Sequence, residues 1–461
     1  MHHFYRKRVS YIMVCAVIML CLITACGISS DSPSTEQDSS PSFASEISES
    51  DLRALYTGTA EVLSEDEQAL YDHTVMLWLQ DDLWRRRDLY DTGHNLMIPM
   101  HYAFRSQNEE AITAFAGFFA RFADDVYGED KYQLQDEYTL GHFHFLYLCT
   151  QFMNLCAATG NDDLIPDGLP ELAQSCAEEY LYGAAIWGTE PTAIEHIRQI
   201  IAGKAYDKHY YSSFDDPEQF ALAILCDLKC WNTLQGRDSD VVLLTAADLA
   251  YQVFRSPQLN QETEKGGWLF QTGVYEDYPD FAYAGNETVF EGMTPRSKED
   301  ITWDSSHFHR MPLFLRSYQS AQSTRDAWEL FICRRQQLAN QMVNYVLKNV
   351  NGYWLTTTFM DGTNGVYRYS YSVEGVGLSG YELSSTFLVG WWSMLMDSRI
   401  TSVYQDTLDM LRAVPLHWNE SNPYFNNTIV QERNPFFSAD TAFESGMMEC
   451  MVLCASKIYP D

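Results

Sequence analysis

The densest group of side chains able to transfer protons or bind a ligand lies in the stretch DITWDSSHFHRMPLFLR, residues 300–316. This stretch contains an indole, a carboxylate, two imidazoles and a guanidinium, on Trp303, Asp304, His307, His309 and Arg310. Carboxylates and imidazoles are common proton donors and acceptors in enzymes. Asp304 could instead cap a helix as an exposed residue, with the histidines packed in a core. Because the cluster contains more polar groups than a helix cap requires, we expect it to form part of a cleft wall.

The spacing within this cluster limits what it can bind. In a helix, Asp304 and His307 share a face, whereas His309 points elsewhere. In a strand, His307 and His309 would share a face, and only then could the pair bind one zinc ion. Pro312 fits the first turn of a helix and favours an extended residue before it. We therefore expect an extended approach that leads into a helix, and we predict no metal or cofactor.

Similar polar clusters precede other apolar runs of the chain, and buried helices would bring them to one rim of the protein. These clusters contain Asp91, His94 and His101; Asp136, His142 and His144; Tyr381 and Glu382; and Asp440 and Glu444. Each has a structural alternative, as a helix cap or a buried histidine. As catalytic candidates we select Asp304, His307, Tyr381 and Glu382. As substrate-binding candidates we select Trp303, His309, Arg310, His94, His142, Tyr369 and Glu444.

The chain begins with a basic segment, MHHFYRKRVS, followed by an apolar run that ends in LITACG. Such a short run after basic residues is typical of a signal peptide rather than a membrane span. Its end resembles the lipobox of bacterial lipoproteins, which implies cleavage before Cys26. The resemblance also implies palmitate or another acyl chain on that thiol and a lipid-anchored location in the cell envelope, at the outer membrane or cell surface. An uncleaved anchor helix is the alternative.

Residues 1–25 are thus the predicted signal peptide, and residues 26–50 form a Ser-rich acidic tether with little to bury. Residues 51–461 contain no further linker, so we expect one domain. The chain has 30 Lys and Arg against 63 Asp and Glu, a net charge of −33. This charge excludes nucleic acid and acidic membrane surfaces as partners and disfavours a long polyanionic substrate. The cysteines beyond Cys26 lie in apolar runs, where most should be buried as small hydrophobic residues.

The body has a helical pattern from about residue 65 to 457, interrupted by a long loop over 258–302 and a predicted β-hairpin over 352–379. Two runs, 141–158 and 385–396, are apolar on all sides and should be inner helices. Alternating inner and outer helices, about a dozen in all, resemble the (α/α)6 toroid of many polysaccharide hydrolases and lyases. The predicted class is therefore all-α, an (α/α)6-like toroid with a small hairpin and a long rim loop.

The resemblance implies a polysaccharide or oligosaccharide as partner. Hydrolysis needs two carboxyl groups beside the glycosidic bond, for which Asp304, Glu382 and Glu444 are available. Trp303, Tyr381 and Tyr369 could stack on sugar rings. A lyase would instead use His307, His309, Tyr381 and Arg310. A non-catalytic lipoprotein for exopolysaccharide export or capture would need only the aromatic groups. We predict a glycoside hydrolase, with the lyase and the binding protein as alternatives; the sequence does not indicate an oligomeric state.

Overall fold

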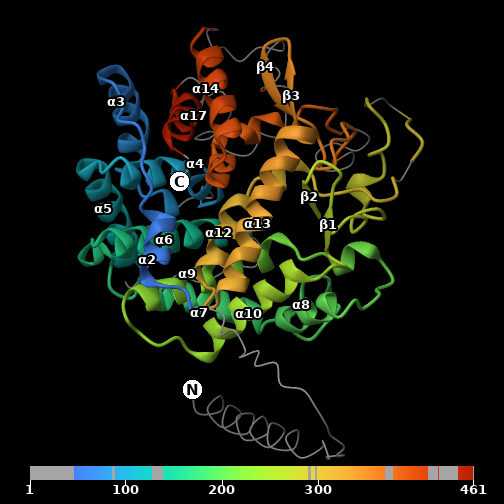
Figure 1. Ribbon diagram of the computed structural model, residues 1–461, viewed down its shortest axis with the longest axis horizontal. Helices are drawn as coiled ribbons and strands as arrows, with labels where there is room; N and C mark the ends of the chain where they lie inside the picture. The colour runs from blue at the N-terminus through green and yellow to red at the C-terminus, as the bar shows by residue number, and fades with distance from the viewer. Residues whose placement is uncertain are drawn as a thin grey trace, which may run out of the picture. The chain divides into compact units, whose positions relative to one another are not determined.

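The computed structural model describes residues 46–85, 89–126, 139–288, 292–295, 298–368, 377–413, 424 and 445–459. All of these belong to one unit that spans residues 44–461. The fold is mostly helical, with two small two-stranded antiparallel sheets (Figure 1). The predicted helical class is confirmed at this level.

The α-helices are α2 (Glu49–Tyr56), α3 (Glu65–Tyr71), α4 (Leu89–Arg105), α5 (Glu109–Val126), α6 (Thr139–Thr159), α7 (Leu169–Leu181), α8 (Ala193–Ile201), α9 (Asp216–Leu234), α10 (Val241–Arg255), α11 (Ser305–Phe308), α12 (Met311–Ser320), α13 (Arg325–Gln341), α14 (Ser398–Ala413) and α17 (Met447–Lys457). Short 3₁₀ segments are η2 (Leu83–Arg85), η4 (Asp162–Leu164), η5 (Ile186–Gly188), η6 (His209–Ser212), η7 (Pro279–Phe281), η9 (Ser384–Val389) and η10 (Trp391–Leu395). Two π-helical turns are η1 (Asp72–Met76) and η8 (Met342–Val346). The strands are β1 (Asn260–Glu262), β2 (Trp268–Phe270), β3 (Leu347–Val350) and β4 (Tyr353–Thr356).

Several helices lie inside the protein and are covered on more than one side. Residues 142–158 of α6 are all buried, as its apolar sequence predicts, because α4, α9 and α2 pack around it. Every residue of α12 is likewise buried, between α9, α13 and η10. The amphipathic helices α5, α7, α10 and α13 pack on this inner layer (Figure 1). The inner helices therefore provide the framework that positions their polar N-terminal ends.

Helix starts follow local capping signals. Asp215 caps α9, and Glu218 accepts from the Asp215 backbone N–H to complete a capping box. Asp240 caps α10 and Asp304 caps α11 by accepting from backbone N–H groups of the first turn, without a capping box. An aspartate cap accepts hydrogen bonds from backbone N–H groups that have no partner within the helix. Two of these three caps, at α9 and α11, recur in the site described below.

The predicted inner helix over 385–396 is wrong in type, although its residues are buried. The segment forms two 3₁₀ stretches, η9 and η10, on either side of Gly390. Gly390 has a left-handed backbone with φ +88°, and a Cβ there would lie 3.2 Å from Ile98 and from Ala455. The close approach of the neighbouring helices thus requires glycine at this point, and the left-handed residue interrupts the helix.

The predicted hairpin over 352–379 is also wrong. β4 pairs with β3, which lies before it, through a turn at Asn351 and Gly352. Both turn residues have positive φ, as an Asn-Gly hairpin turn requires. α13 ends at Gln341, and the chain passes through η8 into β3. In the second half of the predicted hairpin, Tyr367 forms an isolated bridge with Leu378, and residues 369–376 lie outside the described part of the chain.

The long loop after α10 folds back on the segment that follows β4. β1 and β2 form a short hairpin, and the Gly273 N–H then donates to the Ile301 carbonyl. Farther along, the Arg368 N–H donates to Asp280, and the Val366 N–H to Asn286. These bonds hold two loops, 271–288 and 357–368, side by side (Figure 1). Together the loops form one wall of the site.

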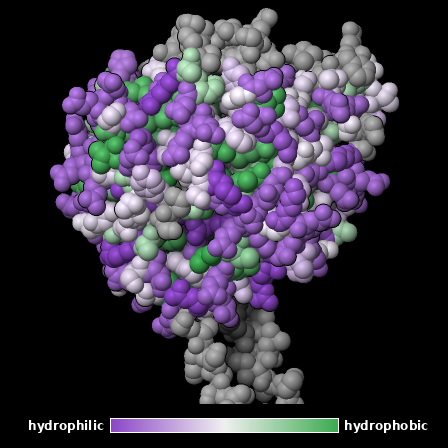
Figure 2. Space-filling view, turned by 45° about the horizontal axis from the view of Figure 1, so that its top comes forward, coloured by the Kyte–Doolittle hydropathy of each residue, from purple (hydrophilic) through white to green (hydrophobic). Residues whose placement is uncertain are grey.

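The surface carries the acidic charge of the sequence. On the face drawn in Figure 2, hydrophilic side chains dominate and hydrophobic ones form separate small groups. Within the described residues, we find no helix with the length and hydropathy of a membrane span.

Seven of the described cysteines are buried and Cys333 is exposed, all with free thiols. The prediction that most cysteines are buried is therefore confirmed.

A buried carboxylate in the helical interior leads to a prediction about stability. Asp227 on α9 is fully buried, and its Oδ2 accepts hydrogen bonds from Thr150 and Gln151 at 2.9 and 2.8 Å. Burial raises the pKa of Asp227 to about 7, although these hydrogen bonds oppose the shift. The unfolded pKa is near 3.9, so rising pH between about 4 and 7 destabilises the fold, by on the order of 4 kcal/mol.

We therefore expect Asp227→Asn to be more stable than the wild type near pH 8, with a difference that shrinks as the pH falls towards about 4. Urea unfolding across this range measures the difference in free energy of unfolding. A difference that does not vary with pH would contradict the assignment.

Candidate functional site

The N-terminal ends of four inner helices meet at one place. Tyr90 and His94 come from the start of α4, and His144 from the start of α6. Asp216 begins α9, and Arg310 precedes α12. Arg310 contacts both Asp216 and Tyr90, and the rings of His94 and His144 lie 4.0 Å apart. Polar clusters that precede apolar helices thus converge, as the sequence predicts for several of them.

Above this meeting point lies a cavity of about 140 Å³. Four carboxylates, an imidazole, a guanidinium and six aromatic rings line it: Asp215, Asp216, Asp280, Asp304, His307, Arg368, Trp187, Tyr275, Tyr278, Phe281, Trp303 and Tyr367. The predicted residues Trp303, Asp304 and His307 are therefore together in one cavity. The lining residues come from η5, the starts of α9 and α11 and the residues just before them, and the two paired loops. Aromatic walls around a few polar groups are typical of small-molecule sites.

Asp304 is fixed at the bottom of this cavity by the turn that follows it. It is 3 % exposed and extended, with φ −72° and ψ 151°, and the helical turn α11 begins at the next residue. Its Oδ1 accepts from the backbone N–H groups of Ser306 and His307, both at 3.0 Å. Burial alone would raise the pKa of Asp304, but the electrostatic attraction and hydrogen bond of the His307 ring N–H, together with the hydrogen bond from Ser306, outweigh burial and lower it. Asp304 is therefore an ionised carboxylate.

His307 connects Asp304 to two residues of the opposite loop. Its Nδ1 lies 2.8 Å from Asp304 Oδ2 and 3.2 Å from the Tyr367 hydroxyl. Because an ionised carboxylate only accepts hydrogen bonds, Nδ1 carries the proton and Nε2 accepts from Arg368 Nη2 at 2.7 Å. Arg368 Nε also donates to the Tyr367 hydroxyl at 2.9 Å. The arrangement fixes the orientation and tautomer of His307.

Asp215 is a second carboxyl group of the cavity with a displaced pKa, which is raised, as is that of Asp280. It is half-buried in the cavity wall at the start of α9. Burial and the charge of Asp216 raise its pKa to about 7. A carboxyl group with this pKa is partly protonated at neutral pH and can donate a proton. Sequence reasoning missed Asp215, although the sequence DDPE before the apolar run at 217–234 is the same signal that selected Asp304.

Arg310 lies behind the cavity rather than in it. It is 1 % exposed, forms an ion pair with Asp216, and donates to the Tyr90 hydroxyl at 2.6 Å. Burial would lower its pKa, but Asp216 and Tyr90 more than offset that effect and raise it. Arg310 therefore neutralises Asp216 and holds the starts of α4, α9 and α12 together, and it does not line the cavity as a ligand-binding residue.

The other predicted histidines form a buried cluster under the cavity. His94 packs against His309, with ring centroids 4.9 Å apart and nearly parallel, and against Trp391 at 5.3 Å. Burial and the charge of Arg310 lower the pKa of His309, which is 2 % exposed. His309 is therefore neutral, and the cluster packs through its aromatic rings. His307 and His309 face different surroundings, and no group of three or more metal-ligating side chains occurs among the described residues.

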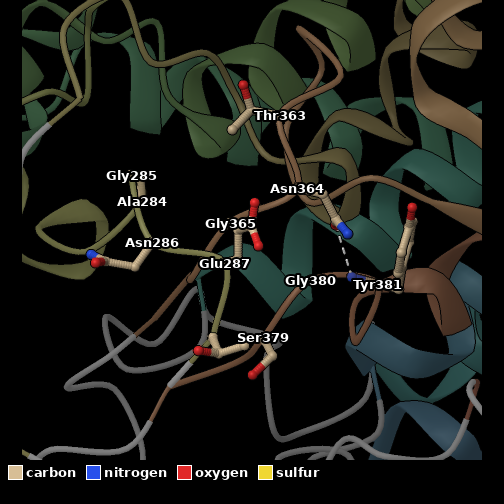
Figure 3. A pocket seen from close by; sticks show the side chains of 11 residues that line it. Ala284, Gly285, Asn286, Glu287, Thr363, Asn364, Gly365, Ser379, Gly380 and Tyr381 are labelled. Carbon is tan, nitrogen blue, oxygen red and sulfur yellow. Dashed lines mark hydrogen bonds between the residues drawn. The ribbon is translucent and has the colours of Figure 1, made fainter. Parts of the chain in front are cut away.

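Tyr381 and Glu382, the other catalytic candidates, lie apart from this cavity. Tyr381 lines a second, polar cavity of about 580 Å³ between the same two loops. Figure 3 shows Asn286 on one side of this cavity and Asn364 and Tyr381 on the other, with the Tyr381 N–H donating to Asn364 at 2.9 Å. Glu382 accepts from the Ser379 N–H at 2.6 Å, and burial raises its pKa. Neither residue lines the cavity of Asp304, so the structure does not pair Glu382 with Asp304.

The remaining candidates are distributed as follows. His142 is buried on α6, where burial lowers its pKa, and it does not line the cavity. Cys26, Tyr369 and Glu444 lie outside the described residues. Nine residues that line the cavity were not selected from the sequence: Asp215, Asp216, Asp280, Arg368, Trp187, Tyr275, Tyr278, Phe281 and Tyr367.

Comparison with known proteins adds no assignment to this geometry. Neither the protein-family models, nor the curated proteins, nor the solved structures that were searched contain a match to this chain.

Proposed function

We propose that the protein is a glycoside hydrolase in which Asp215 donates a proton and Asp304 acts as the ionised carboxylate. One observation carries the proposal: two carboxyl groups in a single aromatic-walled cavity have pKa values displaced in opposite directions. Glycoside hydrolysis requires this division, because one carboxyl must be protonated to assist the leaving group while the other is charged.

The charges of the cavity favour a neutral sugar over a uronate. Asp215 is the protonated donor and Asp216 is paired with Arg310, which leaves Asp280 and Asp304 against the single guanidinium of Arg368 that lines the cavity. Arg310 lies behind the wall, where its charge is matched by Asp216. A substrate carboxylate would therefore meet mainly like charge in a medium of reduced dielectric. The indole and phenol rings of the walls suit the apolar faces of neutral pyranose rings.

In the proposed reaction, Asp215 protonates the glycosidic oxygen as the bond to the anomeric carbon breaks. Asp304 Oδ2 stabilises the positive charge that develops on the sugar, either by attacking the anomeric carbon or by taking a proton from an attacking water. His307 holds Asp304 Oδ2 through Nδ1, and Arg368 holds His307. His307 and Arg368 are thus positioning residues in this reaction.

The test is a survey of neutral and acidic polysaccharides, together with aryl glycosides, with analysis of the products. New reducing ends without an unsaturated uronate support the hydrolase. A second candidate, a polysaccharide lyase, is favoured by the contact of Tyr367, His307 and Arg368 in one cavity. It would cleave only uronate polymers and give products with the ultraviolet absorbance of the unsaturated ring. Binding of oligosaccharides without any cleavage would favour a glycan-binding lipoprotein.

We also propose that the helical body is an (α/α)6-like toroid formed by residues 51–461 as one domain. In support, the inner segments contact one another in a cycle that returns to its start. α4 packs on α6, α6 on α9, α9 on α12, α12 on η10, η10 on α17, and α17 on α4. Such a cycle is expected when helical hairpins close into a ring, with the site at the N-terminal ends of the inner helices.

The sequence before this body supports a proposed lipid anchor at Cys26, which would place the enzyme in the cell envelope outside the cytoplasm. Residues 1–25 would be removed as a signal peptide, and residues 26–50 would serve as the tether. We expect Cys26→Ser to prevent incorporation of a clickable fatty acid and to release the protein from the membrane fraction. Persistent labelling of the Cys26→Ser variant would refute the anchor.

A further inference from the structure

An aromatic surface extends from the cavity of Asp304 towards solvent. We call the four residues Trp187, Tyr210, Tyr211 and Tyr278 the aromatic platform. The Tyr210 ring lies 5.1 Å from Trp187 and 5.0 Å from Tyr278, and Tyr211 lies 6.0 Å from Trp187, measured between ring centroids. Trp187 and Tyr278 also line the cavity, so the platform and the cavity are continuous.

Two features of Trp187 are unfavourable for the stability of the fold, so folding alone does not explain them. Its side chain is 38 % exposed, and of the tryptophans in the described part of the chain it is the one exposed by more than a third. Its backbone is left-handed, with φ 65° and ψ −3°, a conformation that bulky side chains rarely adopt. Strained residues at the edge of a cavity commonly mark ligand contacts.

The platform is fixed by hydrogen bonds to the loop that carries Tyr278. Asp277 accepts from the backbone N–H groups of His209 and Tyr210, at 3.0 and 3.4 Å. The His209 ring also pairs with Glu276 at 2.6 Å. These contacts join η6 to the loop 271–281, so the tyrosine rings keep a defined position beside Trp187. A preorganised surface loses little conformational entropy when a ligand binds.

We propose that the aromatic platform is a binding subsite for a pyranose ring of a neutral oligosaccharide, next to the ring held in the cavity. The inference rests on the proposed function and specifies its substrate as a chain rather than a single sugar. A flat ring such as that of Trp187 covers the C–H groups of a pyranose face, while the half-buried carboxylate of Asp280 beside Tyr278 is placed to accept from sugar hydroxyls.

The test uses Trp187→Gly, because glycine accepts the left-handed backbone and removes only the ring. Binding of cello-, malto-, manno- and xylo-oligosaccharides, from disaccharides to hexasaccharides, is measured by calorimetry in an Asp215→Asn background that prevents turnover. Whichever series the parent protein binds, we expect Trp187→Gly to raise the dissociation constant of its longer members roughly tenfold or more. This is the size of one stacking contact. Trp187→Phe should restore most of the affinity, and the melting temperature of Trp187→Gly should not fall.

Tyr182→Ala is the matched control, since Tyr182 is an exposed aromatic residue (48 %) that does not line the cavity. Unchanged affinity in Trp187→Gly would overturn the platform, and so would a failure of the parent protein to bind any of the four series. The proposed function is judged separately on phenyl monosaccharide glycosides, which have a poor leaving group and place no second sugar ring on the platform. Hydrolysis of these that is lost in Asp215→Asn supports the hydrolase even if the platform fails.

Discussion

Replacing Asp215 with asparagine is expected to lower the rate of glycoside hydrolysis by roughly 10²- to 10⁴-fold, the usual contribution of a general acid. Asparagine preserves the shape of the side chain and remains a good N-cap for α9, so the fold should persist. The variant lacks only the proton that the carboxyl group donates. The measurement is kcat on a substrate with a poor leaving group, either a polysaccharide or a phenyl glycoside that the wild type cleaves.

The pH profile provides a second readout of the same residue. Because the pKa of Asp215 is raised to about 7, the wild type should lose activity as the pH rises through this value and the donor ionises. Asp215→Asn should lack this alkaline limb. Substrates with highly acidic leaving groups, which need little protonation, should lose far less rate than those with poor leaving groups.

Asp240→Asn is a suitable control for this experiment. Asp240 caps α10 as Asp215 caps α9, accepting from the N–H groups of Val242 and Leu243, and it does not line the cavity. It should leave the rate and the pH profile unchanged. If Asp215→Asn retained full activity and the same alkaline limb, Asp215 would not be the proton donor.

The helical part of the fold could be predicted where the sequence pattern was long and regular. The apolar run at 141–158 indicated a helix buried on all sides, and α6 is such a helix. The run at 385–396 has the same composition but contains Gly390, whose left-handed backbone divides it into 3₁₀ segments. The apolar pattern reports burial in both cases. It does not report the close contact with neighbouring helices that requires glycine and interrupts the helix.

The candidate site could be predicted only in part, because its residues come from distant loops. Trp303, Asp304 and His307 were predicted together because they are neighbours in sequence. Arg368 reaches His307 through a loop whose pairing with residues 279–288 depends on backbone hydrogen bonds. No periodic pattern in the sequence indicates that pairing.

A carboxyl group just before a buried segment correctly indicates a site residue at Asp215, whereas the same pattern at Glu382 is misleading. Both carboxyl groups precede buried segments, and burial raises the pKa of both. The 3₁₀ segment after Glu382 begins next to the second cavity. The Glu382 carboxyl group therefore does not line the cavity of Asp304. The start of a buried run therefore suggests a rim position, and only the course of the chain decides which cavity the side chain reaches.

Replacing Asp304 with asparagine is expected to reduce both activity and stability. An exposed cap was the structural alternative for this residue, but Asp304 is 3 % exposed, so the effect on folding should exceed that of a surface cap. The asparagine oxygen can still accept from the N–H groups of Ser306 and His307. Its amide nitrogen would then face the Nδ1–H of His307, and two donors cannot bond to each other. We expect a loss of roughly 2 kcal/mol in the free energy of unfolding at neutral pH.

The pH dependence of this loss identifies its origin. The pKa of Asp304 is lower in the folded protein than in the unfolded chain, so its charge stabilises the fold above about pH 4. That contribution disappears as the pH falls towards the folded pKa. The difference between wild type and Asp304→Asn should therefore be largest at neutral pH and diminish in acid, opposite to the trend expected for Asp227→Asn.

Combining the Asp304 change with His307→Gln separates catalysis from positioning. If His307 acts on the reaction by orienting Asp304, His307→Gln alone should lower kcat modestly, and Asp304→Asn should lower it by roughly 10²- to 10⁴-fold. The double variant should then be no slower than Asp304→Asn, because the orienting contact has no effect once the carboxylate is gone. A lyase in which His307 takes the proton gives the reverse order, with His307→Gln as the slower single variant. The ranking of the three rates thus decides which of the two side chains reacts with the substrate.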